Sequence, residues 1–262
     1  MPRIGLGTWP MDDAQAEVLV AQAIRDGYRL IDTAENYGNE TGVGRGIRAG
    51  GVDRDQIFVT SKFNARWHGF EEVQQAFANS AERLGLDRID MLLIHWPLPQ
   101  QDRYVDAWRG ILHLYEQGKV SVLGVSNFKP AHIDRLIEVT GVAPQVNQVQ
   151  LNPYIGRAAE RRYHAEHGIV TETWQPLGLG GKLLEEAVVL EAARRHSKSP
   201  AQVVLRWQVQ QGLVPIPRTQ NPARIPQNIA VFDFELDASE MAAITALDRN
   251  GAGAADSDRI GH

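Results

Sequence analysis

The stretch Ile89–Trp96 reads Ile-Asp-Met-Leu-Leu-Ile-His-Trp, with four successive apolar residues that end directly before His95. A run without polar alternation is typical of a strand that is covered on both faces, as in a parallel sheet. A segment of helical period, Tyr104–Gln117, follows this run. The two segments together predict one βα unit, the repeating element of parallel α/β folds.

Seven further apolar runs of this kind lie on either side of that unit. We expect the eight strands at Arg3–Trp9, Tyr28–Thr33, Ile57–Phe63, Ile89–Trp96, Val120–Ser126, Val146–Leu151, Ile169–Trp174 and Leu213–Arg218. We expect the helices that follow them at Asp13–Asp26, Glu40–Arg48, Glu71–Leu84, Tyr104–Gln117, Ala131–Thr140, Arg157–His167, Glu185–Arg195 with Ala201–Gln211, and Pro222–Ala230. Eight βα units without a break in composition predict one α/β domain over residues 1–262, a (β/α)8 TIM barrel, rather than an open doubly wound sheet.

The chain ends in a helix and an irregular tail. A last helix is expected at Ala238–Leu247, because Asp237 is a good N-cap and Glu240 completes a capping-box spacing. The tail Gly251–His262 is rich in Gly and Asp and predicts irregular structure.

Composition narrows the function classes. The 27 basic and 32 acidic residues give a net charge of -5 with no long block of like charge, which disfavours nucleic acid as a partner. No apolar run is long enough for a membrane span, and the start MPRIGLGTW has no signal-peptide pattern, so we expect a cytoplasmic protein. No apolar stripe calls for a partner subunit, and we expect a monomer. The absence of Cys excludes cysteine nucleophiles and thiolate metal sites.

Four ionisable side chains lie where the expected strands end. Asp32 ends the second strand, Tyr37 follows it in the next loop, Lys62 ends the third strand, and His95 ends the fourth. In a barrel of this kind, chemistry takes place at the C-terminal ends of the strands, so these side chains meet at one mouth. A solvated strand end is a fair alternative for any one of them, but a weak one for four on three consecutive strands.

The four residue types form a chemically sensible set. A Tyr hydroxyl is a poor acid near neutral pH unless a cation such as the Lys62 ammonium stabilises its phenolate. Asp32 would hold that ammonium charged and oriented, and a neutral His95 would donate a hydrogen bond to a substrate oxygen. The set therefore predicts a proton-donating site with a pocket for a developing oxyanion.

The motifs around these residues resemble those of the aldo-keto reductase family. They are Asp32-Thr-Ala-Glu-Asn-Tyr37-Gly, Thr-Ser-Lys62-Phe, Leu-Leu-Ile-His95-Trp-Pro, Gly124-Val-Ser126-Asn127-Phe and Val146-Asn-Gln148-Val. The resemblance runs from Arg3 to about Asp248. Among prokaryotic members, the segment Glu172-Thr-Trp174-Gln-Pro-Leu177-Gly178 is most similar to the 2,5-diketo-gluconate reductase group.

The resemblance implies NADPH-dependent reduction of aldehydes, ketones or dicarbonyls to alcohols, with Tyr37 as general acid. It implies that Lys62 and Asp32 tune Tyr37 and that His95 orients the carbonyl. It further implies a set of residues that bind the nicotinamide end of the cofactor. In this set Ser126, Asn127 and Gln148 hold the carboxamide, and Trp174 stacks on the ring where most members have Tyr. Leu177 is implied as a further cofactor-binding residue.

A second implied set binds the adenosine 2′-phosphate. It comprises Arg218, Thr219 and Arg224, and Gln227 and Asn228 follow them as further implied cofactor-binding residues. Arg suits phosphate because its planar fork makes bidentate, charge-assisted hydrogen bonds, so NADPH is expected to bind better than NADH. Arg218 stands where Lys is usual in the family and Gln227 where Glu is usual, which leaves the degree of this preference open.

Three tryptophans follow expected strand ends and predict an apolar wall for a small-molecule substrate: Trp9, Trp67 and Trp96. For Trp67, an exposed loop position is nearly as good an interpretation. The family also has an N-terminal β-hairpin that caps the bottom of the barrel. Only the end of that hairpin is present before Ile4, from which we expect lower stability but no effect on the site.

Other interpretations compete with the reductase. A protein of this family can hold NADPH as a redox sensor with little turnover, and a barrel aldolase would use Lys62 as a neutral Schiff-base amine. The segment Gly44–Ala49 fits the dinucleotide pattern G-x-G-x-x-A, but it follows no strand directly, so we interpret it as small residues in a packed helix. His164 and His167, three residues apart, are interpreted as a solvated helix face rather than a metal site.

Overall fold

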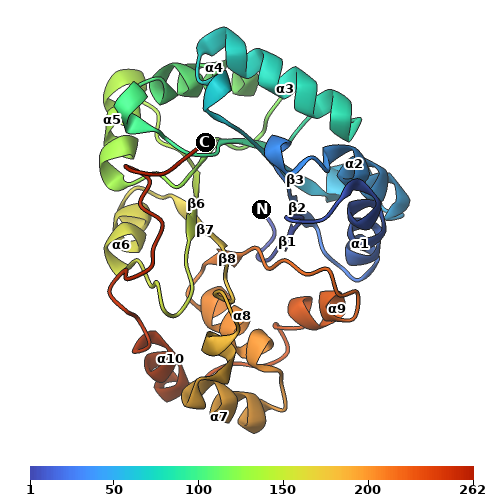
Figure 1. Ribbon diagram of the computed structural model, residues 1–262, viewed down its shortest axis with the longest axis vertical. Coiled ribbons are helices and arrows are strands. Elements are labelled where there is room, and N and C mark those ends of the chain that lie inside the picture. Colours follow the sequence, from blue (N-terminus) through green and yellow to red (C-terminus); the bar gives the residue numbers. More distant parts are fainter.

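A sheet of eight parallel strands lies at the centre of the molecule, in a computed structural model that describes residues 1–262. The strands pair in chain order from β1 to β8, and the helices surround them (Figure 1). The backbone N–H groups of Gly5 and Gly7 donate to the carbonyls of Pro215 and Pro217, at 3.0 Å each, and so join the β1 segment to the β8 segment. This α/β architecture is consistent with the expected (β/α)8 barrel.

Most elements lie where the sequence predicts them. The strands are β1 Leu6–Gly7, β2 Leu30–Asp32, β3 Phe58–Phe63, β4 Met91–Ile94, β5 Gly124–Ser126, β6 Val146–Gln150, β7 Val170–Trp174 and β8 Val214–Pro215. The helices are α1 Asp13–Arg25, α2 Glu40–Ala49, α3 Phe70–Leu84, α4 Tyr104–Glu116, α5 Pro130–Thr140, α6 Ala158–Glu166, α7 Ala187–His196, α8 Pro200–Gln210, α9 Arg224–Ile229 and α10 Ala238–Thr245. None of these helices has the length and apolar character needed to cross a membrane.

Several strands are shorter than expected. The predicted Ile89–Trp96 reduces to β4 and the predicted Val120–Ser126 reduces to β5. The first and last strands shorten by a similar amount. The predicted Arg3–Trp9 reduces to β1 and the predicted Leu213–Arg218 reduces to β8. Pro215 and Pro217 have no N–H group to give to a ladder, which limits regular pairing at β8. A single bridge between Gly7 and Arg218 continues the contact beyond β8.

Local sequence explains where several helices begin and end. The Asp237 carboxylate accepts from the backbone N–H of Glu240, at 2.9 Å, and forms the predicted capping box of α10. Ser199 and Gln202 form a second capping box at the start of α8, where Pro200 occupies the first turn. Gly85 ends α3 with φ of +65°, a left-handed conformation that glycine adopts without steric cost.

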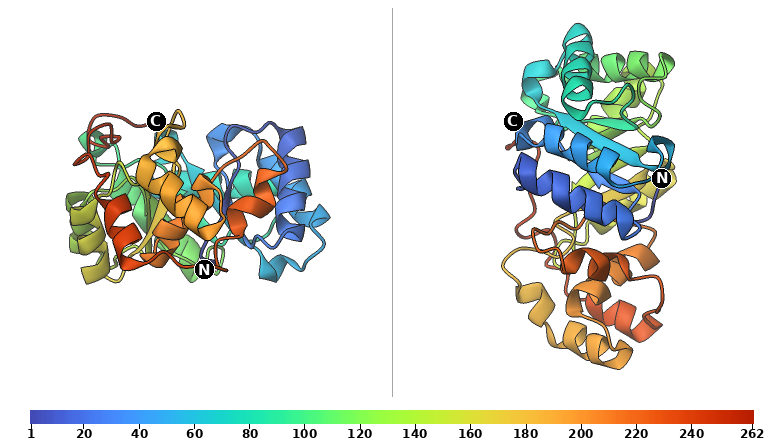
Figure 2. Two further views of the ribbon diagram at one scale, coloured as in Figure 1. Left: turned by 90° about the horizontal axis from the view of Figure 1, so that it is seen from below. Right: turned by 90° about the vertical axis from the view of Figure 1, so that its right-hand side faces the viewer.

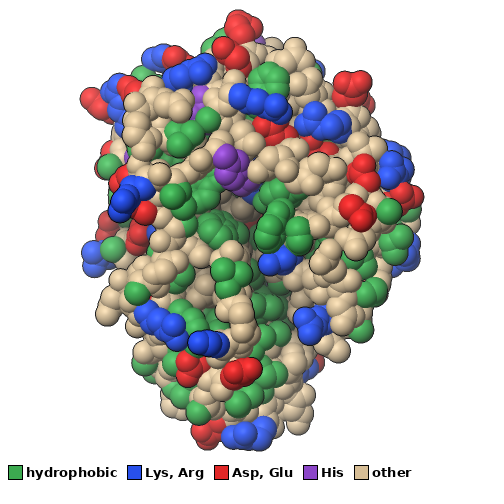
Figure 3. All heavy atoms as spheres, in the orientation of Figure 1, with side chains coloured by type: hydrophobic (Ala, Val, Ile, Leu, Met, Phe, Trp, Pro, Cys, Tyr) green, Lys and Arg blue, Asp and Glu red, His purple; other side chains and the backbone are tan.

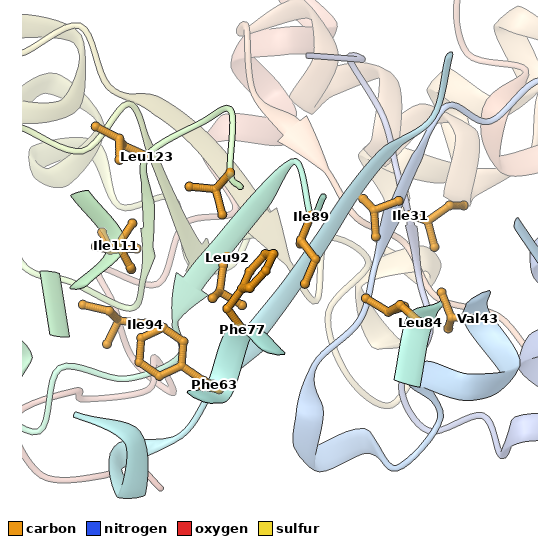
Figure 4. Close-up of a cluster of buried hydrophobic side chains, with 14 of the residues drawn as sticks. Ile31, Val43, Phe63, Phe77, Leu84, Ile89, Leu92, Ile94, Ile111 and Leu123 are labelled. Carbon is orange, nitrogen blue, oxygen red and sulfur yellow. The ribbon is translucent and has the colours of Figure 1, made fainter. Parts of the chain in front are cut away.

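The largest apolar cluster lies between the strands and the helices of the first half of the chain. It comprises 35 buried residues, among them Ile31, Leu92 and Phe77. Figure 4 shows strand side chains such as Leu92 facing helix side chains such as Phe77 across this layer. Trp108 and Trp207 are 0% and 1% exposed, as expected for core residues. The rigid packing of this layer fixes the strand ends at which the polar side chains stand.

The segment Gly44–Ala49 serves helix packing, as its sequence predicts. A Cβ atom on Gly44 would lie 1.9 Å from the carbonyl oxygen of Leu84, and one on Gly42 would lie 2.1 Å from that of Asp13. The glycines of α2 therefore let its backbone approach α1 and α3 closely.

The interpretation of His164 as part of a solvated helix face is wrong. His164 is 1% exposed, and its ring nitrogens contact the Asn147 amide at 3.0 Å and the Thr171 hydroxyl at 2.8 Å. The imidazole joins α6 to β6 and β7, which neither the spacing nor the local composition indicates.

The tail after α10 contains turns but no helix or strand, as expected. It is nevertheless held to the barrel. The Lys129 ammonium binds the carboxylates of Asp256 and Asp258 at 2.6 and 2.5 Å, and the backbone carbonyl of His262 accepts from the N–H of Ala65 at 3.2 Å. The two chain ends lie at opposite ends of the barrel axis (Figure 2). The tail therefore brings His262 to the end of the barrel where the strands finish.

Candidate active site

Three side chains from neighbouring segments meet around one ammonium group. The Lys62 ammonium, on β3, lies 2.7 Å from the Asp32 carboxylate at the end of β2 and 3.4 Å from the Tyr37 hydroxyl. It also donates to the backbone carbonyl of Thr33 at 3.0 Å. Tyr37 lies in the short 3₁₀ helix Glu35–Tyr37, which follows β2. The structure thus brings Asp32, Tyr37 and Lys62 together as the sequence predicts.

The charges of this group are those that a proton-donating site needs. Burial disfavours the charged form of Lys62, but Asp32, Tyr37 and Glu172 outweigh it, and together they raise the pKa of the ammonium above its ordinary value. Lys62 therefore stays charged. For Tyr37 the balance differs from the expectation: burial raises the pKa of the hydroxyl, and the opposing effect of Lys62 is smaller. The phenol consequently keeps its proton at neutral pH, as an acid catalyst must before it reacts.

His95 directly follows β4 and carries no charge at neutral pH. Burial lowers the pKa of its imidazole well below the ordinary value, and the positive charge of Lys62 and the ring of His262 add to this effect. Its ring lies 6.2 Å from that of Tyr37, centroid to centroid, in an edge-on arrangement. No protein group hydrogen-bonds either ring nitrogen, and Nδ1 is buried without a partner. The neutral imidazole is thus available for a ligand oxygen.

Three polar side chains of the expected cofactor set are bonded to one another and to the barrel. The Asn127 amide N–H₂ donates to the His95 carbonyl and to the Ser126 hydroxyl oxygen, at 3.0 Å each. The Asn127 carbonyl oxygen accepts from the indole N–H of Trp174 at 2.8 Å. This hydrogen bond orients both Trp174 and Asn127.

Gln148 connects the Lys62 group to a further carboxyl group. Its amide N–H₂ donates to Asp32 at 2.8 Å and to Glu172 at 2.7 Å. Glu172 lies on β7 and is 0% exposed. In the sequence, Glu172 begins the segment Glu172–Gly178, but no role was predicted for it. Side chains alternate along a strand, so Glu172, two residues before Trp174, belongs to the face of β7 that carries Trp174, and this spacing was the signal available in the sequence.

A cavity of about 320 Å³ opens at this end of the barrel. Ten of the predicted site residues line it: Trp9, Asp32, Tyr37, His95, Trp96, Ser126, Asn127, Gln148, Trp174 and Arg218. Figure 3 shows the molecular surface hollowed near the centre of the ring of helices, with hydrophobic side chains around the hollow. The cavity has the mixed character of small-molecule sites, largely apolar walls with a few convergent polar groups.

The three tryptophans predicted to wall the substrate pocket have different outcomes. Trp9 and Trp96 line the cavity, with 47% and 8% exposure. Trp67 does not line it. Its ring packs against the large apolar cluster and its indole N–H donates to Glu35 at 2.8 Å. The buried Glu35 carboxylate, which lies in the loop after β2, draws Trp67 away from the mouth.

His262 is a cavity residue that the sequence analysis did not assign. Its ring lies 4.7 Å from that of His95 and 6.1 Å from that of Trp96, centroid to centroid. Its Nε2 contacts the Asn36 amide at 2.9 Å. No local pattern predicts this position, because the tail reaches it through contacts with distant segments, among them those of Asp256 and Asp258 with Lys129. Gly7, Asn36, Gln175 and Ile216 are the other unassigned lining residues.

A second cavity, of about 600 Å³, adjoins the first. Gln175 and Arg218 line both, so the two form one elongated depression. Of the residues predicted to bind the 2′-phosphate end, Arg218, Thr219 and Arg224 line the second cavity, together with Leu177. Gln227 and Asn228 lie further along α9 and do not line it. The structure therefore brings two guanidinium groups, but not the whole predicted set, to this end of the depression.

A known protein family matches nearly the whole chain. The family model described as "Aldo/keto reductase family" matches residues 3–249. The chain belongs to the aldo/keto reductase family. This confirms the resemblance carried by the sequence motifs.

Named relatives cover nearly the whole chain. It is 44% identical to methylglyoxal reductase DkgA of Yersinia pestis over 250 residues, which is 95% of this chain and 89% of the relative. It is 47% identical to 2,5-diketo-D-gluconic acid reductase B of a Corynebacterium species over 94% of this chain and 88% of the relative. Among solved structures, a mutant of Gox0644 in complex with NADPH is 40% identical, with a TM-score of 0.95, 100% coverage of this chain and 95% of that one.

Proposed function

We propose that this aldo/keto reductase is a single-domain (β/α)8 barrel that uses NADPH to reduce small aldehydes, ketones or dicarbonyls to alcohols. The observation that carries the proposal is the Lys62 ammonium, which contacts both the Asp32 carboxylate at 2.7 Å and the Tyr37 hydroxyl at 3.4 Å beside the cavity. The names of two relatives, a methylglyoxal reductase and a diketo-gluconic acid reductase, support dicarbonyls as the substrate class.

The catalytic group suits proton donation to a carbonyl oxygen. Tyr37 keeps its proton at rest because burial raises the pKa of its hydroxyl. As negative charge develops on the carbonyl oxygen, Tyr37 gives up that proton and the adjacent Lys62 ammonium stabilises the phenolate. Asp32 holds the ammonium in place, and neutral His95 donates its N–H to the same oxygen and orients the carbonyl.

The elongated depression fits a dinucleotide. NADPH, when bound, supplies the hydride. Trp174 would face the nicotinamide ring, and Ser126, Asn127 and Gln148 would hold its carboxamide. Arg218, Thr219 and Arg224 would hold the 2′-phosphate end, because all three line the second cavity. Gln227 and Asn228 do not line it, so the cavity gives no support for a contact by these two residues. Trp9 and Trp96 would contact the substrate, and His262 would join them at the rim of the same cavity.

A Schiff-base aldolase is the less suitable alternative. It requires a neutral Lys62 amine, whereas Asp32 and the other neighbours raise the pKa of this ammonium. Borohydride trapping of a carbonyl compound on Lys62 would revive the alternative. Two further expectations stay predictions, that the protein is a monomer and that it is cytoplasmic. Sedimentation equilibrium tests the first and cell fractionation tests the second.

Consumption of NADPH in the presence of a panel of aldehydes, ketones and dicarbonyls tests the function. We expect turnover with at least one dicarbonyl and formation of the corresponding alcohol. Tight NADPH binding without consumption by any carbonyl would instead support a redox-sensing protein, the other function that the sequence leaves open.

A further inference from the structure

A second buried carboxyl group lies behind the catalytic group without a cation of its own. Glu172 forms no salt bridge in the structure. Its Oε2 accepts one N–H from Gln148 at 2.7 Å, and its Oε1 is buried with no hydrogen-bond partner. A fully buried acid that is neither ion-paired nor fully hydrogen-bonded costs stability, so its retention in this site calls for a functional reason.

The only group that Glu172 binds is the amide of Gln148. This amide donates one N–H to Asp32 and the other to Glu172, so both of its donors are engaged. Rotation of the amide by half a turn would place its carbonyl oxygen against the Asp32 carboxylate, where lone pairs repel one another. The Asp32 carboxylate and the acceptor oxygen of Glu172 together therefore favour one orientation of the amide, in which both N–H groups are engaged.

This orientation decides what Gln148 offers to the cavity. Gln148 lines the cavity, and its side-chain carbonyl oxygen Oε1 makes no hydrogen bond within the protein. The carbonyl oxygen is thus a fixed acceptor without a protein partner. With Asp32 alone, only one N–H would be engaged, and the amide would lose part of its orientational restraint.

Burial and the charges around Glu172 keep it protonated, and in this state it can still accept the hydrogen bond from Gln148. Burial and the negative charge of Asp32 raise the pKa of Glu172 to about 8, and the hydrogen bond from Gln148 and the charge of Lys62 oppose this only in part. Val214, its neighbour on β8, contributes no charge. At neutral pH the group is protonated, and a carboxylic acid still has an acceptor oxygen for Gln148.

We infer that Glu172 is a positioning residue for the cofactor: together with Asp32 it locks the Gln148 amide so that its carbonyl oxygen accepts from the carboxamide N–H₂ of the nicotinamide. The inference rests on the proposed function, since it assumes that the nicotinamide end occupies this cavity. Glu172 lines neither cavity, so it acts only through Gln148.

The dissociation constant of NADPH, measured by quenching of tryptophan fluorescence, tests the inference without any turnover. Glu172→Leu removes the acceptor, and Glu172→Asp shortens the side chain by one methylene so that it no longer reaches Gln148. We expect each to weaken NADPH binding about fivefold to twentyfold, as for the loss of one restrained hydrogen bond. Glu172→Gln keeps the length and an acceptor oxygen, and we expect it to restore binding to within about twofold of the parent protein. In steady state the Leu and Asp variants should raise the KM for NADPH more than they lower kcat.

A double-mutant cycle separates positioning from general destabilisation. In a Gln148→Ala background, Glu172→Leu should have no further effect on the NADPH dissociation constant. Thr173→Val is the matched control, because Thr173 is buried on the outer face of the same strand and donates to Gln208 at 2.5 Å. We expect it to lower the unfolding temperature and leave NADPH affinity unchanged.

Two results would overturn the inference. The first is NADPH binding within twofold of the parent protein by a folded Glu172→Asp or Glu172→Leu variant. The second is an equal loss of affinity from Glu172→Leu with and without Gln148. Failure of the proposed function is distinguishable, because the parent protein would then bind no NADPH, or would bind it and reduce no carbonyl.

Discussion

At the scale of single residues, the site depends on the opposed effects of burial and charge on a few titratable groups. Burial alone would neutralise Lys62, yet its neighbours keep it charged, and burial keeps the Tyr37 proton in place despite the nearby ammonium. His95 is neutral for the same physical reason, since a buried imidazolium beside Lys62 is unfavourable. Each group is thus held in the protonation state that carbonyl reduction needs before the reaction begins.

Replacing the proposed acid isolates its contribution. Tyr37→Phe removes the hydroxyl and keeps the ring that packs near His95. We expect kcat to fall at least about 100-fold, the usual effect of losing a general acid. The NADPH dissociation constant should change little. Stopped-flow measurement of NADPH oxidation checks the first expectation and fluorescence titration the second, and a variant that turns over at the parent rate would remove Tyr37 from its role.

The ionisation of Glu172 predicts a specific effect on stability. The folded protein raises the pKa of this group from the ordinary value of 4.5 to about 8, so between these values the folded state binds a proton that the unfolded state has lost. The resulting stabilisation is complete below about pH 4.5 and is lost as the pH rises to about 8. Urea unfolding from pH 5 to pH 8 should therefore show Glu172→Gln gaining stability relative to the parent protein, on the order of a few kcal/mol in total. A difference that is independent of pH would contradict a neutral Glu172.

At the scale of elements, the pairing of the parallel strands determines where the catalytic side chains lie, and the helices pack against these strands. Lys62 lies in register with Leu93 on β4, and Asp32 with Thr60 on β3, so the ladder itself brings the polar ends of these strands to one side. Parallel pairing of adjacent strands is thus the direct reason why residues 30 positions apart in the chain form an ion pair. The 3₁₀ helix after β2 then adds Tyr37, and α9 adds Arg224 at the other end of the depression.

The short helix α9 begins at Arg224, beside the second cavity. We expect Arg224→Ala to weaken NADPH binding about tenfold or more and to leave NADH binding nearly unchanged, because only NADPH has the 2′-phosphate that a guanidinium pairs with. Parallel titrations with the two cofactors measure this. Arg194→Ala serves as the control, because Arg194 is an exposed residue of α7 outside both cavities. Equal weakening of both cofactors would remove Arg224 from the phosphate end.

Helix α2 approaches α3 closely at Gly44, where there is no room for a side chain. We expect Gly44→Ala to lower the free energy of unfolding by about 1–3 kcal/mol or more, because its Cβ would lie 1.9 Å from the Leu84 carbonyl oxygen and the helices must separate. Arg45→Ala, one residue along, removes only a half-exposed ion pair with Glu17 and should change stability by less than about 1 kcal/mol. Urea unfolding of both variants checks the difference, and equal stabilities would show that the helices relax freely.

At the scale of the whole molecule, the C-terminal tail contributes His262 to the lining of the cavity. The tail lies far in the sequence from most of the strands whose ends form this cavity. Lys129, just before α5, binds both Asp256 and Asp258, and His132 adds a contact to Asp258 at 2.9 Å. These contacts hold the segment that ends in His262 against His95 and Trp96. The substrate end of the cavity therefore depends on contacts made some distance from it.

Loosening the tail should affect the substrate more than the cofactor. Lys129→Met removes two partly exposed ion pairs, each worth up to about 1 kcal/mol. We expect KM for a dicarbonyl to rise about threefold to tenfold, and the NADPH dissociation constant to stay within about twofold. High salt should produce part of the same effect in the parent protein, because it screens these pairs. An unchanged KM would mean that the tail keeps its place without Lys129.

The amino-acid sequence alone determined the eight βα units, the order and approximate positions of their elements, and the placement of Asp32, Tyr37, Lys62 and His95 at one end of the barrel. These features follow from short-range periodicity and from the rule that parallel strands end on one side, so they need no knowledge of distant contacts. Only the tertiary structure decided that Trp67 lies away from the cavity, that His262 lines it, and that Glu172 reaches Gln148. It also decided the direction of the Tyr37 pKa shift. Each of these depends on burial and on contacts between residues far apart in the chain, which no local pattern records.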